Sequence, residues 1–320
     1  SFPTLCWLNV SDSFLRFLCW GGAGISVLLV LDFAPALMLI LAWFFYLSLI
    51  TVCREFLWFQ WDILLLETGF LAIFFAPWKI LPGLSKGAET PRAVLWLFRW
   101  LLFRLMFQSG CVKLLSGDET WRSMSALQFH YETQPIPNRV SWYAHQLPAG
   151  FHTFSVGVMF AVELFLPFLF FLPRRLRLFA CAGNVLLQLL IIVTGNYCFF
   201  NWLTLALCLL LLDDALLTSV TPRRWQNVAK NKIGSVQKTV FTLAGSLIFV
   251  LGAAQLFGTF RERREPAWKI QEWIAPYHLS NSYGLFAVMT VNRPEIVIAG
   301  SADAENWLEY EFKWKPGDLK

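Results

Sequence analysis

The feature that most constrains this chain is a series of apolar stretches, each about as long as a membrane-spanning helix. A helix needs about 20 mainly apolar residues to cross the hydrocarbon core of a bilayer. The composition agrees, because 57% of the 320 residues are hydrophobic and only 15% are charged. Eight stretches qualify, each bounded by charge, proline or a short polar turn: 14–31, 35–52, 56–78, 93–112, 153–172, 178–195, 197–217 and 238–258. The sequence therefore predicts a polytopic α-helical membrane protein with about eight transmembrane helices.

Three regions follow from this pattern. Residues 1–13 form an N-terminal segment, 14–258 form the transmembrane domain with a long polar loop at 113–152, and 259–320 form a C-terminal region. In that last region apolar and charged residues alternate with the period of a half-buried strand, the apolar members being Leu308, Tyr310, Phe312 and Trp314. The stretch EIVIAGS is the expected partner strand and SADAEN the expected turn. We expect the beginning of a β-rich domain that continues beyond residue 320, as the chain itself is expected to begin before Ser1.

The basic residues predict the orientation in the membrane, because Lys and Arg favour cytosolic loops. Loops on one side carry most of them: Lys79, Lys86, Arg92, Arg174, Arg175, Arg177, Arg223, Arg224, Lys230, Lys232 and Lys238. The opposite side carries few: Arg54, Lys113, Arg122 and Arg139. We therefore expect the 113–152 loop and both ends of the chain to face the exterior or a lumen. The net charge of +5 reflects this topology, and no basic stripe with exposed aromatic residues predicts a nucleic-acid partner.

Two covalent features would fit an oxidising lumen. A disulfide between Cys6 and Cys111 is geometrically conceivable there, although the seven cysteines have no spacing signature and most lie inside spans as small apolar residues. Asn9 begins the glycosylation sequon N-V-S. The closeness of Asn9 to the first span argues against its use.

Charged residues inside the spans need partners, because each costs about 2.5–3.5 kcal/mol near the middle of a bilayer. The third span carries Asp62 and Glu67, and the fourth carries Arg104 at an intermediate depth. We expect Arg104 to pair with Glu67 or Asp62 and so to lock two helices together. A proton or substrate pathway is the alternative. Isolated polar groups on other spans are expected to form hydrogen bonds between helices: Glu163, Asn184, Gln188, Asn201 and Gln255.

The polar loop invites a metal or catalytic interpretation. His130, Glu132, His145 and His152 are potential ligands, but their spacing matches no zinc motif. We expect no metal and no cofactor, and a rigid surface loop whose histidines bond to the backbone. Lys113 is a candidate general base, since a lysine in apolar surroundings can have a lowered pKa. No G-x-S-x-G motif indicates a serine nucleophile.

Six segments together resemble the lipase maturation factor family: 59–78, 99–121, 126–148, 167–180, 195–214 and 293–319. The most specific strings are WDILLLETGF and HYETQPIP. The resemblance implies a multi-pass protein of the endoplasmic reticulum membrane, which assists folding, assembly and maturation of secreted homodimeric lipases. It also implies that the lumenal C-terminal region contacts these clients. The family has a further N-terminal span and a longer C-terminal domain than this chain shows.

A more distant similarity is to the vitamin K-dependent carboxylase, whose membrane domain has a basic lysine shortly before an acidic residue and a Trp. KLLSGDETW places Lys113 and Trp121 in that order with a longer gap. Our first hypothesis is a non-enzymatic maturation factor whose partners are lumenal clients and membrane lipids. The alternative is a membrane enzyme that acts on a lipid or polypeptide through Lys113, His130 and Glu132. Transport is third, because no repeat of broken helices is visible.

Overall fold

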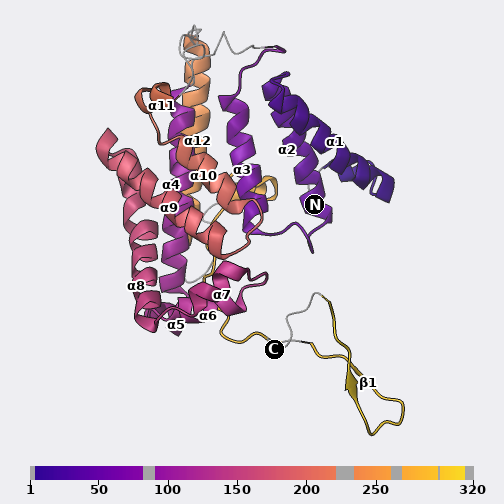
Figure 1. The fold of residues 1–320 in the computed structure, drawn as a ribbon. Helices are drawn as coiled ribbons and strands as arrows, with labels where there is room; N and C mark the ends of the chain where they lie inside the picture. The colour runs from indigo at the N-terminus through magenta and orange to yellow at the C-terminus, as the bar shows by residue number, and fades with distance from the viewer. Residues whose placement is uncertain (1–3, 82–90, 221–233, 261–268, 295, 314–320) are drawn as a thin grey trace.

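The protein is a bundle of long helices with a group of short helices at one end (Figure 1). The computed structural model describes residues 4–81, 91–220, 234–260, 269–294 and 296–313. The long helices are α1 (Asp12–Val30), α2 (Pro35–Val52), α3 (Gln60–Phe75), α4 (Arg92–Leu115), α8 (Ala149–Phe160), α9 (Arg174–Thr194), α10 (Phe200–Leu209) and α12 (Ser235–Gly258). The short elements are η1 (Leu5–Trp7), α5 (Glu119–Arg122), α6 (Ala126–Thr133), α7 (Arg139–His145), η2 (Ala161–Phe165), η3 (Leu166–Phe171), α11 (Asp214–Val220), α13 (Lys269–Ile274) and η5 (Ala275–Tyr277).

Several helices begin where the sequence supplies a cap or a proline. Asn138 Oδ1 accepts from Ser141 N at 2.8 Å, while Asn138 N donates to Ser141 Oγ at 2.9 Å, so both ends of a capping box start α7. Asp118 Oδ1 accepts from Thr120 N at 2.7 Å at the start of α5. Prolines precede or open other helices, where a missing N–H costs nothing: Pro35, Pro91, Pro148 and Pro173.

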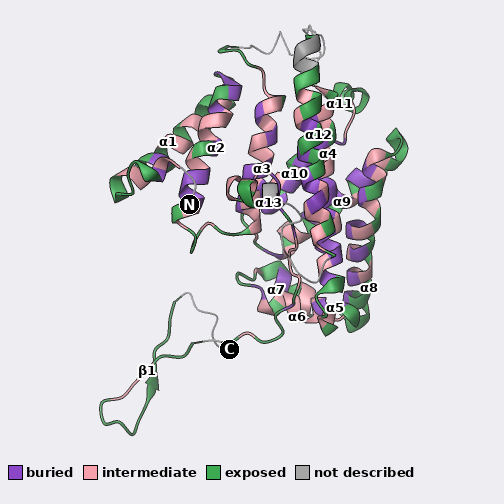
Figure 2. Ribbon diagram, turned by 180° about the vertical axis from the view of Figure 1, so that it is seen from behind, coloured by how far each residue is buried: buried purple, intermediate pink, exposed green. Residues whose placement is uncertain are grey.

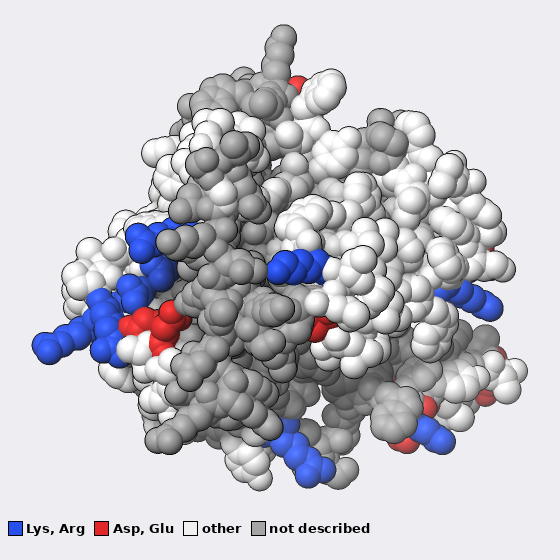
Figure 3. Space-filling view, turned by 90° about the horizontal axis from the view of Figure 1, so that it is seen from above, with Lys and Arg blue, Asp and Glu red and all other residues white. Residues whose placement is uncertain are grey.

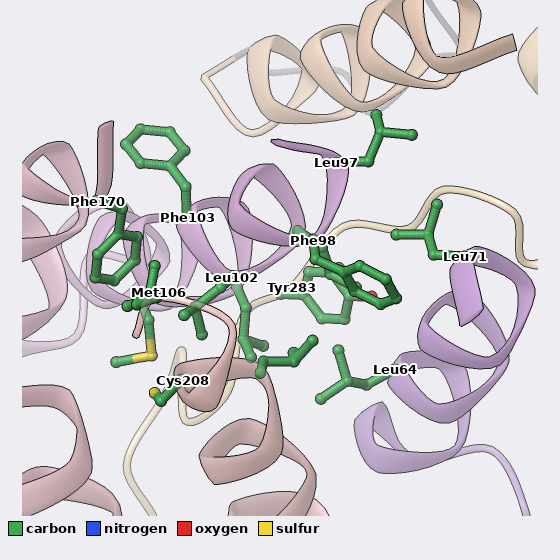
Figure 4. Packing of buried hydrophobic residues seen from close by; sticks show 14 of the residues in the cluster. Leu64, Leu71, Leu97, Phe98, Leu102, Phe103, Met106, Phe170, Cys208 and Tyr283 are labelled. Atoms are coloured by element: carbon green, nitrogen blue, oxygen red, sulfur yellow. The ribbon is translucent and has the colours of Figure 1, made fainter. Parts of the chain in front are cut away.

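Helix α4 lies at the centre of the bundle and is buried along most of its length. Its side chains form one apolar core with residues of α3, α9, α10 and η3, and the core also includes Tyr283 from the C-terminal region. Figure 4 shows Tyr283 beside Phe98 and Leu102 of α4. Figure 2 shows the contrast with α1, which is largely exposed and packs against α2. The C-terminal region therefore contributes to the core of the membrane domain.

The predicted count of eight spans is not confirmed. Five helices in the described part of the chain are long and apolar enough to cross a membrane: Asp12–Val30, Pro35–Val52, Ala149–Phe171, Arg174–Thr194 and Thr239–Gly258. The other three expected spans fall short for different physical reasons. Helix α3 has 16 residues and α10 has 10, whereas α4 has 24 but carries Arg92, Arg99, Arg104 and Lys113. These three helices form the interior of the bundle, where neighbouring helices shield their polar groups.

The short helices α5, α6 and α7 cover one end of the bundle, and the C-terminal hairpin emerges at the same end (Figure 1). Helix α11 lies at the opposite end. Five of the eleven basic residues expected on the cytosolic side fall in 82–90 and 221–233, outside the described residues. The cytosolic and lumenal assignments thus stay predictions.

The predicted hairpin forms, but it is short. Strand β1 (Ala299–Gly300) pairs antiparallel with β2 (Leu308–Glu309), and Tyr310 N donates to Ile298 O at 2.8 Å. The carboxylate of Asp303 closes the predicted turn by accepting from two backbone N–H groups, which lowers its pKa. No larger sheet is present in the described residues, so a β-rich domain is not confirmed. The apolar side chains expected in a core are exposed instead, and Trp314 lies outside the described residues.

A glycine allows α12 to pack closely on α4. A Cβ atom at Gly252 would lie 2.6 Å from Trp100 Nε1 and 2.9 Å from Arg104 Nε, whereas one at Gly258, on the same helix, would meet nothing within 4 Å. Trp100 Nε1 and Arg104 Nε, the atoms nearest to Gly252, are themselves buried, so they have little room to move.

We therefore expect Gly252→Ala to lower the free energy of unfolding by about 1–3 kcal/mol, the usual cost of overpacking. The matched control Gly258→Ala should leave stability unchanged or raise it by up to about 1 kcal/mol, because Ala favours the helix. Thermal unfolding of the purified protein in detergent measures both. Equal effects of the two substitutions would contradict this packing.

Candidate functional site

The most polar part of the interior is built where the C-terminal segment enters the helix bundle. After η5 the chain turns at His278, which has a φ of 51°, and residues 278–285 run between α3, α4 and α12. Ser280, Asn281 and Tyr283 are all buried. Sequence reasoning placed this segment in the lumen and did not predict its burial.

The predicted pair between Arg104 and Glu67 is present at this point. Arg104 Nη2 donates to Glu67 Oε1, and both side chains are almost fully buried, at 1% and 0% exposure. Arg104 also donates through Nη1 to Asn281 O at 2.8 Å. One guanidinium therefore joins α3, α4 and the C-terminal segment.

The second oxygen of Glu67 is saturated by the C-terminal segment alone. Glu67 Oε2 accepts from Asn281 N at 2.9 Å, from Asn281 Nδ2 at 3.1 Å and from Tyr283 Oη at 2.8 Å. A buried carboxylate requires such compensation, because an unpaired charge in the interior costs several kcal/mol. Without residues 278–283, Glu67 would lose three of the hydrogen bonds that stabilise its charge.

Two glutamines bind the next backbone groups of the segment. Gln108 Oε1 accepts from Tyr283 N at 3.2 Å, and Gln60 Oε1 accepts from Gly284 N at 3.0 Å. Gln108 Nε2 donates in turn to Thr259 Oγ1 at 3.0 Å. Helices α3, α4 and α12 thus all hold the same few residues. We call this set of groups around Glu67 and Arg104 the anchor.

Asp62 is not part of the anchor, and the alternative pairing of Arg104 with Asp62 is wrong. Asp62 Oδ2 accepts from Phe59 N at 2.9 Å, and Oδ1 accepts from Tyr46 Oη of α2. The carboxylate therefore caps the start of α3 and ties it to α2. Position 62 lies in the first turn of α3, where a negative charge is favourable.

A second buried ion pair lies deeper toward the short helices. Lys113 Nζ donates to Glu163 Oε1 at 2.9 Å, to Oε2 at 2.7 Å and to Ser109 O at 3.2 Å. The ammonium also lies 5.5 Å from the centre of the Trp121 ring, a cation–π distance. Sequence reasoning treated Glu163 as an isolated polar group and missed this pairing.

The helix that carries Glu163 changes its winding at that residue. Residues Ala161–Phe165 form a π-helical turn between α8 and η3. Pro167 explains the change, because it lacks the N–H that an α-helix would direct at the Glu163 carbonyl and its ring would collide with that carbonyl. A Cβ at Gly110 would lie 2.6 Å from Leu164 Cδ2, so only glycine lets the turn approach α4 this closely. In the sequence, a glutamate four residues before a proline was the signal for this change in helix winding.

The Lys113–Glu163 pair borders a small cavity of about 50 Å³. Polar groups from other helices reach it, including Gln188 and Asn201, which are joined by a 2.7 Å hydrogen bond. One water molecule needs a cavity volume of about 10–15 Å³. The space accommodates a few waters and is too small for a lipid or a peptide.

Aromatic residues from three parts of the chain close this cavity. Tyr197 and Phe286 line it, and the Tyr197 hydroxyl lies 3.0 Å from His130 Nε2. The His130 ring packs edge-on against Phe286 at 5.3 Å. Burial, together with the positive charge of Lys113, lowers the pKa of His130 to about 4. The imidazole is therefore neutral at pH 7, and α6 covers the cavity without adding a charge.

The candidate catalytic and metal residues of the loop do not share one point. Glu132 pairs with His145 at 3.1 Å on the surface, while His130 contacts Tyr197 and Phe286, which line the buried cavity. His152 Nε2 lies 3.4 Å from the carbonyl of His145. Within the part of the chain that the structure describes, no three His, Cys, Asp or Glu side chains gather as metal ligands would.

The predicted disulfide does not form. Cys6 and Cys111 are both free and buried, and Cys6 Sγ donates to Ser48 O at 3.4 Å. Cys6 packs in a small cluster with Leu18 and Leu49 of α1 and α2, whereas Cys111 belongs to the central helix α4. Asn9 is exposed just before α1 and accepts from Ser11 N at 2.8 Å, and its glycosylation stays a prediction.

These features define a class: a multi-pass helical membrane protein whose C-terminal segment is anchored in the bundle by buried ionic and amide groups. The family profile described as the lipase maturation factor transmembrane domain matches residues 1–219, and the one described as the lipase maturation factor C-terminal domain matches residues 279–320. The chain belongs to the lipase maturation factor family.

Individual relatives support the assignment over nearly the whole chain. Lipase maturation factor 2 of Xenopus laevis is 37% identical, covering 99% of this chain and 60% of its own length. Lipase maturation factor 1 of Bos taurus is 36% identical with the same coverage, and that of Homo sapiens is 35% identical over 99% of this chain and 59% of its own. The chain thus spans about 60% of the length of these relatives. No solved structure matches.

A double-substitution cycle tests the second ion pair. Lys113→Met or Glu163→Met alone should lower the free energy of unfolding by about 3–5 kcal/mol, because each leaves one buried charge without its partner. Both changes together should cost much less than the sum, since no charge is then left. Chemical or thermal unfolding in detergent gives the four stabilities. Additive effects would show that the two charges do not compensate each other.

Proposed function

We propose that this chain is the membrane domain and the beginning of the lumenal domain of an endoplasmic reticulum factor. This factor assists secreted homodimeric lipases in folding, assembly and maturation. The proposal rests on membership of the lipase maturation factor family, whose relatives are named for lipase maturation. In the proposed arrangement residues 259–320 belong to the lumenal side, from which residues 278–285 reach into the helix bundle. The chain crosses the membrane up to eight times if α3, α4 and α10 also span it.

The observation that carries the proposal is the contact between the two family regions. The C-terminal family region begins at residue 279, and its first residues are those of the anchor. The polar contacts of Asn281, Tyr283 and Gly284 with α3 and α4 fix this start within the membrane domain. A lumenal domain that continues from such a start is held at a defined height and direction above the membrane. We infer that the membrane domain acts as a rigid mount for a client-binding domain.

The short helices extend this mount on the side where the C-terminal region leaves the bundle. Met289 N donates to Asp118 Oδ2 at 2.6 Å, Trp121 Nε1 donates to Phe286 O at 2.9 Å, and Arg293 Nη1 donates to Glu132 O at 3.1 Å. The carboxylate of Asp118 has a lowered pKa because the hydroxyl of Thr120 and backbone N–H groups donate to it, which outweighs its desolvation. These contacts guide residues 286–293 across α5 and α6 toward the hairpin.

The hairpin is the part of the described chain best suited to meet a client. Leu308, Tyr310 and Phe312 are 76%, 63% and 48% exposed. Exposed apolar side chains beside an edge strand favour pairing with another polypeptide. We therefore propose these residues, with Trp314, as the start of the client-contacting region.

An enzymatic role through Lys113, His130 and Glu132 is not proposed. Lys113 is bound by both oxygens of Glu163, His130 is bound by Tyr197, and Glu132 faces the surface with His145. The cavity next to Lys113 also lacks room for a lipid or peptide substrate.

The proposal is tested by secretion of a homodimeric lipase from cells that lack their own maturation factor. Leu308→Asp and Phe312→Asp in the full-length protein should lower secreted lipase activity and the dimer fraction several-fold, because they place charge on the apolar face. The matched control Glu311→Gln, between these positions, should have little effect. The amount of maturation factor in the membrane should be equal for all variants.

The opposite pattern would overturn the proposal. If Leu308→Asp and Phe312→Asp leave secretion intact while a well-expressed Lys113→Met protein abolishes it, the function lies in the buried cavity. In that case an enzymatic mechanism replaces the mount.

A further inference from the structure

An apolar groove of about 500 Å³ runs along the outside of the bundle between α4 and α12. Trp96 and Trp100 of α4 form one wall, Phe249 of α12 forms the other, and Phe171 of η3 closes a side. Gly245 and Ser246 of α12 also line the groove, and their small size leaves room for it. The groove flanks Thr239–Gly258, a helix long and apolar enough to span a membrane, so hydrocarbon is the expected surrounding.

A group of arginines adjoins this groove. The guanidinium of Arg99 lies 5.9 Å from the centre of the Trp96 ring, which stacks on Phe171 at 5.4 Å. Arg99 Nε is buried without a hydrogen-bond partner in the described part of the chain. Arg177 is close enough for its positive charge to act on Arg99. Arg177 Nε donates to Leu211 O at 2.8 Å and Arg177 shares Asp213 with Arg174, whereas Arg99 has no ion pair in the described part of the chain. An anion that contacts both guanidiniums at the edge of a bilayer would therefore be favourable.

Among the residues that the structure describes, the acidic groups near this cluster are fewer than the arginines. Asp213 Oδ2 lies 2.5 Å from Arg174 Nε but 3.8 Å from Arg177 Nη2. With the sequence neighbours Arg175 and Asp214, the cluster contains two carboxylates and four arginines, which are Arg99, Arg174, Arg175 and Arg177. Figure 3, seen along the bundle from this end, shows Lys and Arg side chains gathered around a few acidic ones. The cluster therefore has a net positive charge.

We propose that this region binds an anionic phospholipid. One acyl chain lies in the groove against Trp96 and Trp100, and the phosphate is bound by Arg99 and Arg177. Guanidinium groups bind phosphate oxygens in a bidentate manner, and basic clusters at the cytosolic face favour anionic lipids. The proposal is independent of the lipase function, because it concerns the opposite end of the bundle from the hairpin.

Native mass spectrometry of the intact protein, released from detergent with added lipid, tests this binding. Phosphatidylinositol should bind more tightly than phosphatidylcholine, and Arg99→Gln or Arg177→Gln should weaken it by about tenfold, the loss expected for one charge-assisted hydrogen bond. The control Arg16→Gln removes an exposed arginine of α1 and should not change binding. Glycerophosphoinositol, which has the same headgroup without acyl chains, should bind weakly.

The groove is tested separately on α12. Ser246→Trp fills it and should weaken phosphatidylinositol binding, whereas Leu247→Trp adds the same ring at an exposed position that does not line the groove. The thermal midpoint of each variant in detergent shows that it is folded.

Three results would overturn the proposal. Equal binding of the two phospholipids would remove the role of charge, and equal effects of Arg99→Gln and Arg16→Gln would remove the role of this cluster. Tight binding of glycerophosphoinositol that Ser246→Trp does not weaken would show a simple anion site in place of a lipid site.

Discussion

The contact between Glu67 and Arg104 is the interaction on which the rest of this structure depends. Both groups lie in helices within the bundle, where neither charge is tolerated alone. The second oxygen of Glu67 and Nη1 of Arg104 still need partners, and the chain uses Asn281 and Tyr283 for this purpose. The ion pair thereby requires the C-terminal segment, and the segment requires the ion pair. This mutual dependence makes two family regions into one folded unit.

The second pair, Lys113 with Glu163, follows the same logic but faces a different neighbour. A proline-induced π turn directs Glu163 at α4, and the small cavity beside the pair is closed by aromatic groups of α6, the 195–199 loop and the C-terminal segment. Residues 278–293 therefore pass first the Glu67 anchor and then the cover of the Lys113 cavity. The charges inside the bundle position this segment. This role explains why the apolar helices of the membrane domain contain charged residues.

Hydrophobic pattern and charge placement predicted much of this arrangement. Apolar length predicted the membrane-protein class, and the requirement that intramembrane charges have partners predicted the contact of Arg104 with Glu67. The count of eight spans is not confirmed, because α3 and α10 are short and α4 is charged, and five helices of the described residues meet the length and apolarity of a span. The entry of residues 278–284 into the bundle was not predictable, since HLSNSYG has neither the length nor the apolarity of a buried element. Long-range hydrogen bonds create its burial, and no local pattern records them.

The central claim is that residues 279–284 are held inside the membrane domain by the anchor. Hydrogen–deuterium exchange of the purified protein, followed by mass spectrometry, measures this most directly. The account predicts that a peptide covering 279–284 exchanges slowly, because the N–H groups of Asn281, Tyr283 and Gly284 are bonded to Glu67, Gln108 and Gln60. A peptide covering the exposed turn at 301–307 should exchange fast. Rapid exchange of 279–284, at the rate of that turn, would contradict the account.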